Sequence, residues 1–282
     1  MIQLIALDLD GTLVSDDKTI CVRNQRALQK AREKGVYVVL CSGRSPDGMR
    51  RELSMLQLQQ PGQYSVGLNG GVVFESATGR MIKRTCMRPE SAQALIALGR
   101  SLSEYVNIQL YTGEHVYVER WDETTDFYRK ATGSEPVLIK NLEKYQGSVV
   151  KLGFFRRGER SADLTKIRKL REIIATQAPE DIQCAISAPY LVETFDRQID
   201  KSKGLMVLGE LLQIEAAQMM AMGDQENDLP MIRYAGIGVA MANAVDEVKK
   251  VSDYITKSDN NEGGVGEAVE RFVLSEEALT NE

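Results

Sequence analysis

Short apolar runs alternate with amphipathic segments in the first part of the chain. Residues 2–7 read Ile-Gln-Leu-Ile-Ala-Leu, and residues 36–41 read Val-Tyr-Val-Val-Leu-Cys. Nearly continuous apolar runs of this length are typical of parallel strands that are buried on both faces. Between them, small and apolar side chains recur at helical spacing over residues 21–34 and predict a helix. Residues 72–75 and 81–83 predict a hairpin.

The middle of the chain, residues 85–188, follows a different pattern. Strands are predicted largely in pairs, and single helices lie between them. The predicted strands are residues 106–111, 115–120, 136–139, 148–155 and 181–187, with a last strand of the series at residues 190–196, and the predicted helices are residues 89–103, 122–131 and 161–177. This mixture predicts an α+β layer rather than continued winding of a parallel sheet.

The strict order of strand and helix returns after residue 203. A helix is predicted at residues 203–213, and an apolar strand at residues 217–222 follows it. We therefore expect an α/β fold with a Rossmann-like parallel-sheet core that both ends of the chain build together. The expected domains are a core of residues 1–84 and 189–282, and an inserted α+β domain of residues 85–188.

Composition excludes several classes of function. The chain has 282 residues, 43% of them hydrophobic and 27% charged, which suits a globular protein of about two domains. A net charge of −5 without a basic stripe argues against nucleic-acid binding. No stretch approaches the roughly 18 apolar residues of a membrane span, and Asp8 interrupts the N-terminal run, so we expect no signal peptide. The four cysteines form no CxxC pair, which favours reduced thiols and a cytoplasmic location.

Chemistry in this chain must rest mainly on carboxylates and lysines. The sequence contains one histidine, His115, which excludes His-rich metal centres. We expect His115 itself to be a structural or surface residue of the middle segment.

Two aspartates follow the first predicted strand. Residues 8–13 read Asp-Leu-Asp-Gly-Thr-Leu, and the two-residue period of a strand points Asp8 and Asp10 to the same side. Carboxylates held this close repel each other unless they share a proton or a cation. A site made only of oxygen ligands suits Mg²⁺, and Gly11 allows the chain to turn tightly after the two aspartates.

Two weaker clusters lie at other predicted strand ends, where open α/β sheets bind ligands. Ser42-Gly43-Arg44 combines a hydroxyl, a glycine amide and a helix start, as an anion site does, although Ser-Gly turns are common. Lys203 opens a predicted helix, where a cation is unfavourable without an anionic partner such as a ligand phosphate. Lys201 competes for this role, and a solvated surface lysine is the alternative.

The fourth cluster follows the predicted strand at residues 217–222. Residues 223–228 read Gly-Asp-Gln-Glu-Asn-Asp, and a capping loop alone explains one or two of these polar side chains but not the whole set. Asp224 would add a metal ligand to Asp8. Asn227 and Asp228 would position the waters of the metal or the phosphate.

In combination these clusters resemble the four motifs of the haloacid dehalogenase (HAD) superfamily. The matching segments are residues 8–13, Ser42-Gly43-Arg44, Lys203-Gly204 and residues 223–228, and residues 68–71 and 238–244 are similar to the Cof-type phosphatase branch. The resemblance implies a HAD-like core with a large C2-type cap domain. Residues 85–188 match that cap by their element order and position. Leu68 departs from the branch, which often has Ser there.

The resemblance implies Mg²⁺-dependent hydrolysis of phosphate monoesters. Asp8 would attack phosphorus and form an aspartyl-phosphate, and Asp10 would act first as general acid and then as base. Mg²⁺ would be held by the Asp8 carboxylate, the Asp10 backbone carbonyl and Asp224. The groups expected to bind the phosphoryl oxygens or to support the site are Ser42, Lys203, Asn227, the backbone amides of Leu9 and Gly43, Arg44, and Thr12 and Asp228 behind them.

The expected substrate is a small phosphorylated metabolite, such as a sugar phosphate, whose identity depends on the inserted domain. A weak or inactive protein that binds phosphometabolites is one alternative, and a phosphomutase, which begins with the same aspartyl-phosphate, is another. The phospho-acceptor domains of signalling proteins also combine a strand-end Asp, a hydroxyl and a Lys. Asp10-Gly11-Thr12, Gly223-Asp224 and the inserted domain argue against that class. No pattern in the sequence predicts an oligomeric state.

Overall fold

The computed structural model describes residues 1–158 and 164–275. The described residues group into two compact units. The core unit comprises Met1–Gly43, Arg50–Lys83 and the described residues from Asp200 onward, and the inserted unit comprises Arg44–Met49 and the described part of Arg84–Ile199. Among these described residues, no helix is both long enough and apolar enough to cross a lipid bilayer.

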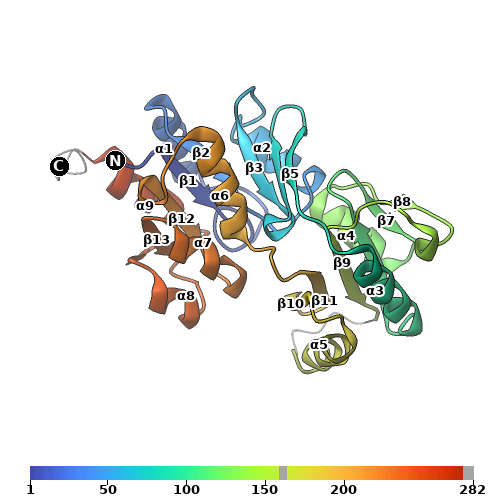
Figure 1. The fold of residues 1–282 in the computed structure, drawn as a ribbon. Helices are drawn as coiled ribbons and strands as arrows, with labels where there is room; N and C mark the ends of the chain where they lie inside the picture. The colour runs from blue at the N-terminus through green and yellow to red at the C-terminus, as the bar shows by residue number, and fades with distance from the viewer. Residues whose placement is uncertain (159–163, 276–282) are drawn as a thin grey trace. The chain divides into compact units, whose positions relative to one another are not determined.

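A parallel sheet forms the centre of the core unit. Its strands are β1 (Leu4–Leu7), β2 (Tyr37–Leu40), β12 (Met219–Gly223), β13 (Ile237–Ala240) and β14 (Tyr254–Ile255), in the order β14-β13-β12-β1-β2. Every residue of β1 is buried, as its unbroken apolar sequence predicts for a central parallel strand. Leu4 pairs with Met219 in β12 and with Tyr37 in β2, so segments from the two ends of the chain lie side by side (Figure 1).

Helices cover this sheet in two groups. The first is α1 (Val22–Glu33), which packs against α9 (Gly264–Val269) and the π-helical turn Glu270–Leu274. The second is α7 (Leu229–Tyr234), which packs on β12 and β13 and lies against α6 (Lys201–Leu212) and α8 (Asp246–Val251). α2 (Arg50–Met55) follows the short 3₁₀ turn Asp47–Met49.

A small second sheet extends the core unit. β3 (Tyr64–Gly67) pairs in antiparallel fashion with β4 (Val72–Glu75), and the sheet order continues to β5 (Met81–Arg84). Cys41, just beyond β2, forms a parallel bridge with Val66 of β3. This bridge sets the loop after β3 beside the loop after β2, and both loops contribute to the candidate site described below.

The inserted unit has its own sheet, of order β10-β11-β9-β6-β7-β8. Its strands are β6 (Val106–Tyr111), β7 (Val116–Val118), β8 (Val137–Leu138), β9 (Lys151–Arg156), β10 (Ile182–Ala188) and β11 (Leu191–Asp196). α3 (Pro89–Ser101) packs on β6 and β9, and α5 (Thr165–Gln177) packs on β10 and β11. α4 (Glu123–Thr132) follows β7. The mixture of paired strands and single helices is the α+β layer that the sequence predicts.

The boundaries of the inserted unit differ from the sequence expectation. A boundary between residues 188 and 189 would divide the hairpin in which Cys184 of β10 pairs with Thr194 of β11. The structure keeps this hairpin in one unit and places the change of unit after Ile199. Part of the helix predicted at residues 161–177 lies outside the described residues, and α5 begins at Thr165.

Candidate active site

The Asp8 side chain lies at the end of the central strand β1. Asp8 is 7% exposed, and its backbone N–H donates to the Met222 carbonyl of β12 at 3.1 Å. After Asp8 the chain turns sharply, because the backbone N–H groups of Thr12 and Val14 both donate to the Leu9 carbonyl. The turn needs glycine at position 11, where φ is +88° and a Cβ atom would lie 2.5 Å from Asp224 Oδ2. The first and fourth sequence clusters therefore meet in space.

Asp8, Asp224 and Asp228 form a buried carboxylate cluster. A ligand atom from each of these side chains lies within 4.8 Å of the others. Burial raises the pKa of Asp8 well above its ordinary value, and the charges of Asp228 and Asp224 act in the same direction. Burial and Asp228 also raise the pKa of Asp224 to about 6. The clustered carboxylates thus disfavour one another's ionised forms, and a bound cation would relieve this repulsion.

One cation lies inside this cluster, and it belongs to Lys201. The fully buried Lys201 Nζ is 2.5 Å from Asp8 Oδ1 and 2.6 Å from Asp228 Oδ1. Burial alone would lower the pKa of Lys201, but the charges of Asp228 and Asp8 outweigh it and raise the pKa above its ordinary value. Lys201 therefore stays charged beside Asp8.

The structure places Lys201, and not the predicted Lys203, beside Asp8. Lys203 is exposed, and its Nζ lies 4.0 Å from Met206 Sδ, on the helix surface. The helix begins at Lys201 because the Asp200 side chain caps it and accepts the Lys203 backbone N–H at 3.1 Å. Two residues along a helix rotate a side chain by roughly 200°, so only one of the two lysines can point at Asp8.

Asp224 and Asp228 are held by their own loop and by the first cluster. Thr12 Oγ1 donates to Asp224 Oδ1 at 2.8 Å. Asp228 Oδ2 accepts the backbone N–H groups of Asp224 at 2.9 Å and of Gln225 at 3.0 Å. A Cβ atom at Gly223 would collide with the Asp228 side chain, so the loop closes tightly over it. Thr12 and Asp228 thus contact the groups that they were expected to support.

Asp10 occupies a different environment from Asp8. Its Oδ1 lies 3.1 Å from Lys18 Nζ, and the two side chains are 46% and 51% exposed. Among the described residues, the group of three carboxylates contains Asp228 and not the Asp10 side chain. The expected metal ligand at Asp10 is its backbone carbonyl, and the expected acid–base group is its carboxyl, which solvent reaches.

The second cluster is divided between the two units. Ser42 and Gly43 belong to the core unit, whereas Arg44 belongs to the inserted unit, where its Nη1 donates to the Gly48 carbonyl at 3.2 Å. Ser42 is 3% exposed, and its backbone N–H donates to the Val66 carbonyl at 2.9 Å. The preceding Cys41 is no competing nucleophile, because burial raises the pKa of its thiol to about 12.

Asn227 reaches the second cluster through a residue to which the sequence analysis gave no role. Asn227 Nδ2 donates to Asn69 Oδ1 at 3.4 Å, and the Asn69 backbone N–H donates to the Ser42 carbonyl at 3.0 Å. The sequence signal for Asn69 is the short run Asn69-Gly70-Gly71, which lies in the segment that resembles the Cof-type branch.

A second asparagine pair steadies the turn after Asp8. Asn243 Nδ2 donates to the Gly11 carbonyl at 2.7 Å, and its Oδ1 accepts the Asn260 backbone N–H at 3.2 Å. The buried Asn260 side chain donates in turn to the Val14 carbonyl at 3.1 Å. These residues lie far from Asp8 in sequence, so no local spacing connects them to it.

The carboxylate cluster fits a hard divalent cation. Asp8 and Asp224 offer oxygen ligands, which such cations prefer, and burial together with the neighbouring carboxylates raises the pKa of both carboxyls. Lys201 neutralises Asp8 and Asp228 but forms no ion pair with Asp224. Asp224, which Lys201 does not pair, would hold a cation together with the neighbouring Asp8 carboxylate.

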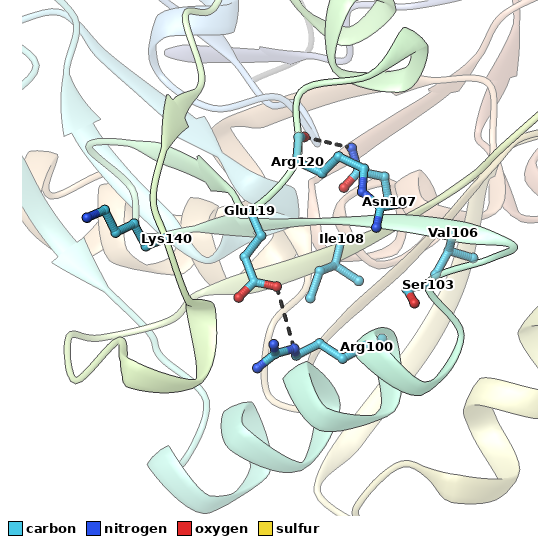
Figure 2. A pocket seen from close by; sticks show the side chains of 9 residues that line it. Arg100, Ser103, Val106, Asn107, Ile108, Glu119, Arg120 and Lys140 are labelled. Atoms are coloured by element: carbon cyan, nitrogen blue, oxygen red, sulfur yellow. Dashed lines mark hydrogen bonds and ion pairs between the residues drawn. The ribbon is translucent and has the colours of Figure 1, made fainter.

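The inserted unit contains a separate pocket of about 230 Å³ beside the end of α3 (Figure 2). Arg100 Nε lies 3.7 Å from Glu119 Oε2, and the same guanidinium pairs with Glu143. Glu119 Oε1 also accepts the Leu142 backbone N–H at 2.6 Å. These contacts hold the Arg100 and Glu119 side chains against their neighbours in the inserted unit.

Comparison with known proteins places these features in context. A family model described as haloacid dehalogenase-like hydrolase matches residues 5–269. The chain is 31% identical to the 5-amino-6-(5-phospho-D-ribitylamino)uracil phosphatase YcsE of Bacillus subtilis, over 97% of this chain and 96% of that protein. It is 28% identical to a phosphoglycolate phosphatase of Methanobrevibacter smithii, over 97% and 99% of the two chains. The crystal structure of a haloacid dehalogenase-like hydrolase from Bacteroides thetaiotaomicron has a TM-score of 0.84 and 31% identity, and the match covers 96% of this chain and 100% of that one.

Proposed function

The chain belongs to the haloacid dehalogenase-like hydrolase family, and from this premise we propose that it hydrolyses small phosphorylated metabolites through an aspartyl-phosphate on Asp8. The observation that carries the proposal is the position of Asp8 at the end of β1. There the carboxylate is buried, lies 2.5 Å from the Lys201 ammonium and shares a cluster with Asp224. A carboxylate in this setting suits nucleophilic attack on an anionic phosphoryl group.

The first step transfers the phosphoryl group to the protein. An Asp8 carboxylate oxygen attacks phosphorus in line with the leaving oxygen, and the bond from phosphorus to that oxygen breaks. The Asp10 carboxyl gives its proton to the leaving oxygen, so an alcohol departs. The exposure of the Asp10 side chain supports this role, because the group can exchange protons with solvent between turnovers.

The second step returns the phosphoryl group to water. Asp10, now ionised, accepts a proton from a water molecule whose oxygen attacks the phosphorus of the aspartyl-phosphate. The bond between phosphorus and the Asp8 oxygen breaks, inorganic phosphate leaves, and both aspartates return to their starting states. Because Asp10 both donates and accepts the proton in this cycle, the mechanism does not require His115.

The groups around Asp8 have separable tasks. The Lys201 ammonium opposes the effect of burial on the pKa of Asp8 and so favours the ionised carboxylate, while Asp228 holds the Lys201 ammonium in place. Ser42, Asn227 and the amides of Leu9 and Gly43 would donate to the phosphoryl oxygens. Mg²⁺ held by Asp8, Asp224 and the Asp10 carbonyl would supply charge that offsets the approach of two anions.

The substrate class follows from the family and its relatives. The relatives named above act, by their names, on a phosphorylated ribitylamino-uracil and on phosphoglycolate, which are both small phosphorylated metabolites. We propose that the core unit binds the phosphate and that the inserted unit, as a cap domain, selects the remainder of the molecule.

The test is phosphate release from p-nitrophenyl phosphate, measured with and without MgCl₂. We expect turnover by the wild type with MgCl₂ and none by Asp8→Asn, together with a phosphorylated Asp8 peptide in acid-quenched wild type. His115→Ala is the control, since His115 is exposed in the inserted unit and should leave turnover nearly unchanged.

Three results would contradict the proposal. Wild type that releases no phosphate from p-nitrophenyl phosphate or from a panel of phosphorylated metabolites would indicate a binding protein. A stable phospho-Asp8 without turnover would indicate a signalling role. Transfer of the phosphoryl group to a second sugar hydroxyl in place of water would indicate a phosphomutase.

A further inference from the structure

Three consecutive residues after β3 have left-handed backbone conformations. Leu68, Asn69 and Gly70 have φ angles of 50°, 59° and 102°. Glycine adopts such angles without strain and asparagine tolerates them, but leucine does not. Strained backbone of this kind persists only where the surrounding structure holds it, and it concentrates at functional sites.

This turn contacts the loop that carries Ser42 and Gly43, the residue before Lys201, and the loop of residues 223–228. The Asn69 backbone N–H donates to the Ser42 carbonyl at 3.0 Å, and the Asn227 side chain donates to Asn69 Oδ1 at 3.4 Å. A Cβ atom at Gly70 would collide with the Asp200 carbonyl, directly before Lys201. One short turn thus contacts Ser42, Asn227 and the residue next to Lys201.

Burial leaves the turn little freedom to relax. Leu68 is fully buried and Asn69 is 3% exposed. A Cβ atom at Gly43 would lie 3.0 Å from Asn69 Oδ1, so the glycine of the second cluster and the asparagine are closely fitted. A displacement of the Asn69 side chain would therefore be passed to Gly43 and Asn227 rather than absorbed by empty space.

We infer that Asn69 is a positioning residue that holds the Ser42-Gly43 turn and the Asn227 side chain in mutual register for one phosphoryl group. The inference rests on the proposed function, because it assigns a task to that same site. The left-handed backbone places Asn69 where its N–H reaches the Ser42 carbonyl and its side chain reaches Asn227. Aligned donors matter most in the transition state, where charge on the phosphoryl oxygens is greatest.

The test compares Asn69→Gly with Asn69→Ala. Both variants lose the side-chain amide, but glycine accepts a φ of 59° and alanine does not. We expect kcat for p-nitrophenyl phosphate to fall by roughly tenfold to a hundredfold in both, with a smaller change in KM. Inhibition by orthovanadate, which mimics the transition state, should weaken in parallel with kcat. The melting temperature should fall further in Asn69→Ala than in Asn69→Gly, because alanine adds backbone strain to the side-chain contacts that both variants lose.

Gln213→Gly is the matched control. Gln213 has a φ of 56° and lies exposed at the end of α6, so the substitution relieves the same kind of strain away from the site. It should leave kcat and orthovanadate inhibition unchanged. Asn69→Gly with wild-type kcat, or a loss of kcat that follows melting temperature across the variants, would overturn the inference. Because wild-type turnover is measured in the same experiment, a failure of the proposed function remains distinguishable.

Discussion

At the scale of single residues, the arrangement of charge around Asp8 determines what the site can do. Lys201 is the cation that contacts two of the clustered carboxylates, and its ammonium lies 2.5 Å from Asp8 and 2.6 Å from Asp228. A buried ion pair adds little net stability. Removal of one partner is nevertheless strongly destabilising, because it leaves the other charge unpaired in the protein interior. Removal of Lys201 is therefore expected to lower stability as well as the proposed activity.

The first prediction concerns the two lysines of α6. Lys201→Met should lower the free energy of unfolding by about 3 kcal/mol, because Asp8 and Asp228 lose their buried partner. It should also lower kcat by about a hundredfold or more, because transition-state charge loses a cation. Urea unfolding and steady-state kinetics measure the two effects. The exposed Lys203→Met should change neither, and the reverse pattern would restore Lys203 as the site lysine.

The second prediction concerns the pH dependence that Asp224 introduces. Burial and Asp228 raise the pKa of Asp224 from 3.8 to about 6, so the folded protein binds this proton more tightly than the unfolded chain. In metal-free protein, the stability from this carboxyl is complete below about pH 4 and is lost as the pH rises through about 6. Mg²⁺ binds the ionised carboxylate and should offset that loss.

Thermal unfolding with and without MgCl₂ tests this reasoning. The increase in melting temperature caused by MgCl₂ should be larger at about pH 7 than at about pH 5, where the proton competes with the cation. Asp224→Asn should remove most of the increase at the higher pH. Equal increases at both pH values would show that Asp224 does not hold the cation.

At the scale of elements, the turn after β1 brings two distant clusters into contact. Gly11 lies so close to Asp224 that a Cβ atom would be 2.5 Å from its Oδ2. The same turn is held by Asn243, which donates to the Gly11 carbonyl at 2.7 Å. The position of Asp8 therefore depends on a backbone conformation as much as on the sequence of the motif.

The third prediction separates backbone strain from steric contact with two glycines. Gly11 and Gly35 have nearly the same φ, +88° and +85°, but a Cβ at Gly35 would have no neighbour within 4 Å. Gly35→Ala should lower the free energy of unfolding by about 1–2 kcal/mol and leave kcat unchanged. Gly11→Ala should show at least this loss and also abolish turnover, because the added methyl group displaces Asp224. Phosphate release and urea unfolding of both variants give the comparison, and active Gly11→Ala protein would contradict it.

The elements also show how far the sequence alone could be used. Parallel β1 and the convergence of Asp8 with Asp224 follow from apolar runs that end in acidic residues, because parallel strands end at one edge of a sheet. The choice between Lys201 and Lys203 depends on where Asp200 caps α6, and the usual uncertainty of one or two residues in a helix start reverses it. The role of Asn69 depends on a left-handed turn, which no hydrophobic pattern records.

At the scale of the whole molecule, the two units differ in how the chain builds them. The core sheet places β1 next to β12, so it needs segments separated by more than half of the chain. The strands of the inserted unit's sheet, β6 to β11, come from one stretch of the chain; α3 directly precedes this stretch, and α4 and α5 lie within it. The pairing of β1 with β12 closes a long loop and therefore has the larger entropic cost. The strands of the inserted unit pair over shorter separations in sequence.

The last prediction follows from this difference. Residues 84–199 expressed alone should fold cooperatively, because this stretch contains all strands of the unit's sheet and lacks only Arg44–Met49 of its described residues. The missing segment removes the contact of the Ser45 hydroxyl with Ser134 at 3.1 Å, which should lower stability without preventing folding. Residues 1–199 should in contrast fail to form the core sheet, since β12 and β13 are absent. Circular dichroism melting of both fragments tests the idea, and a non-cooperative transition in residues 84–199 would show that the inserted unit depends on the core for its stability.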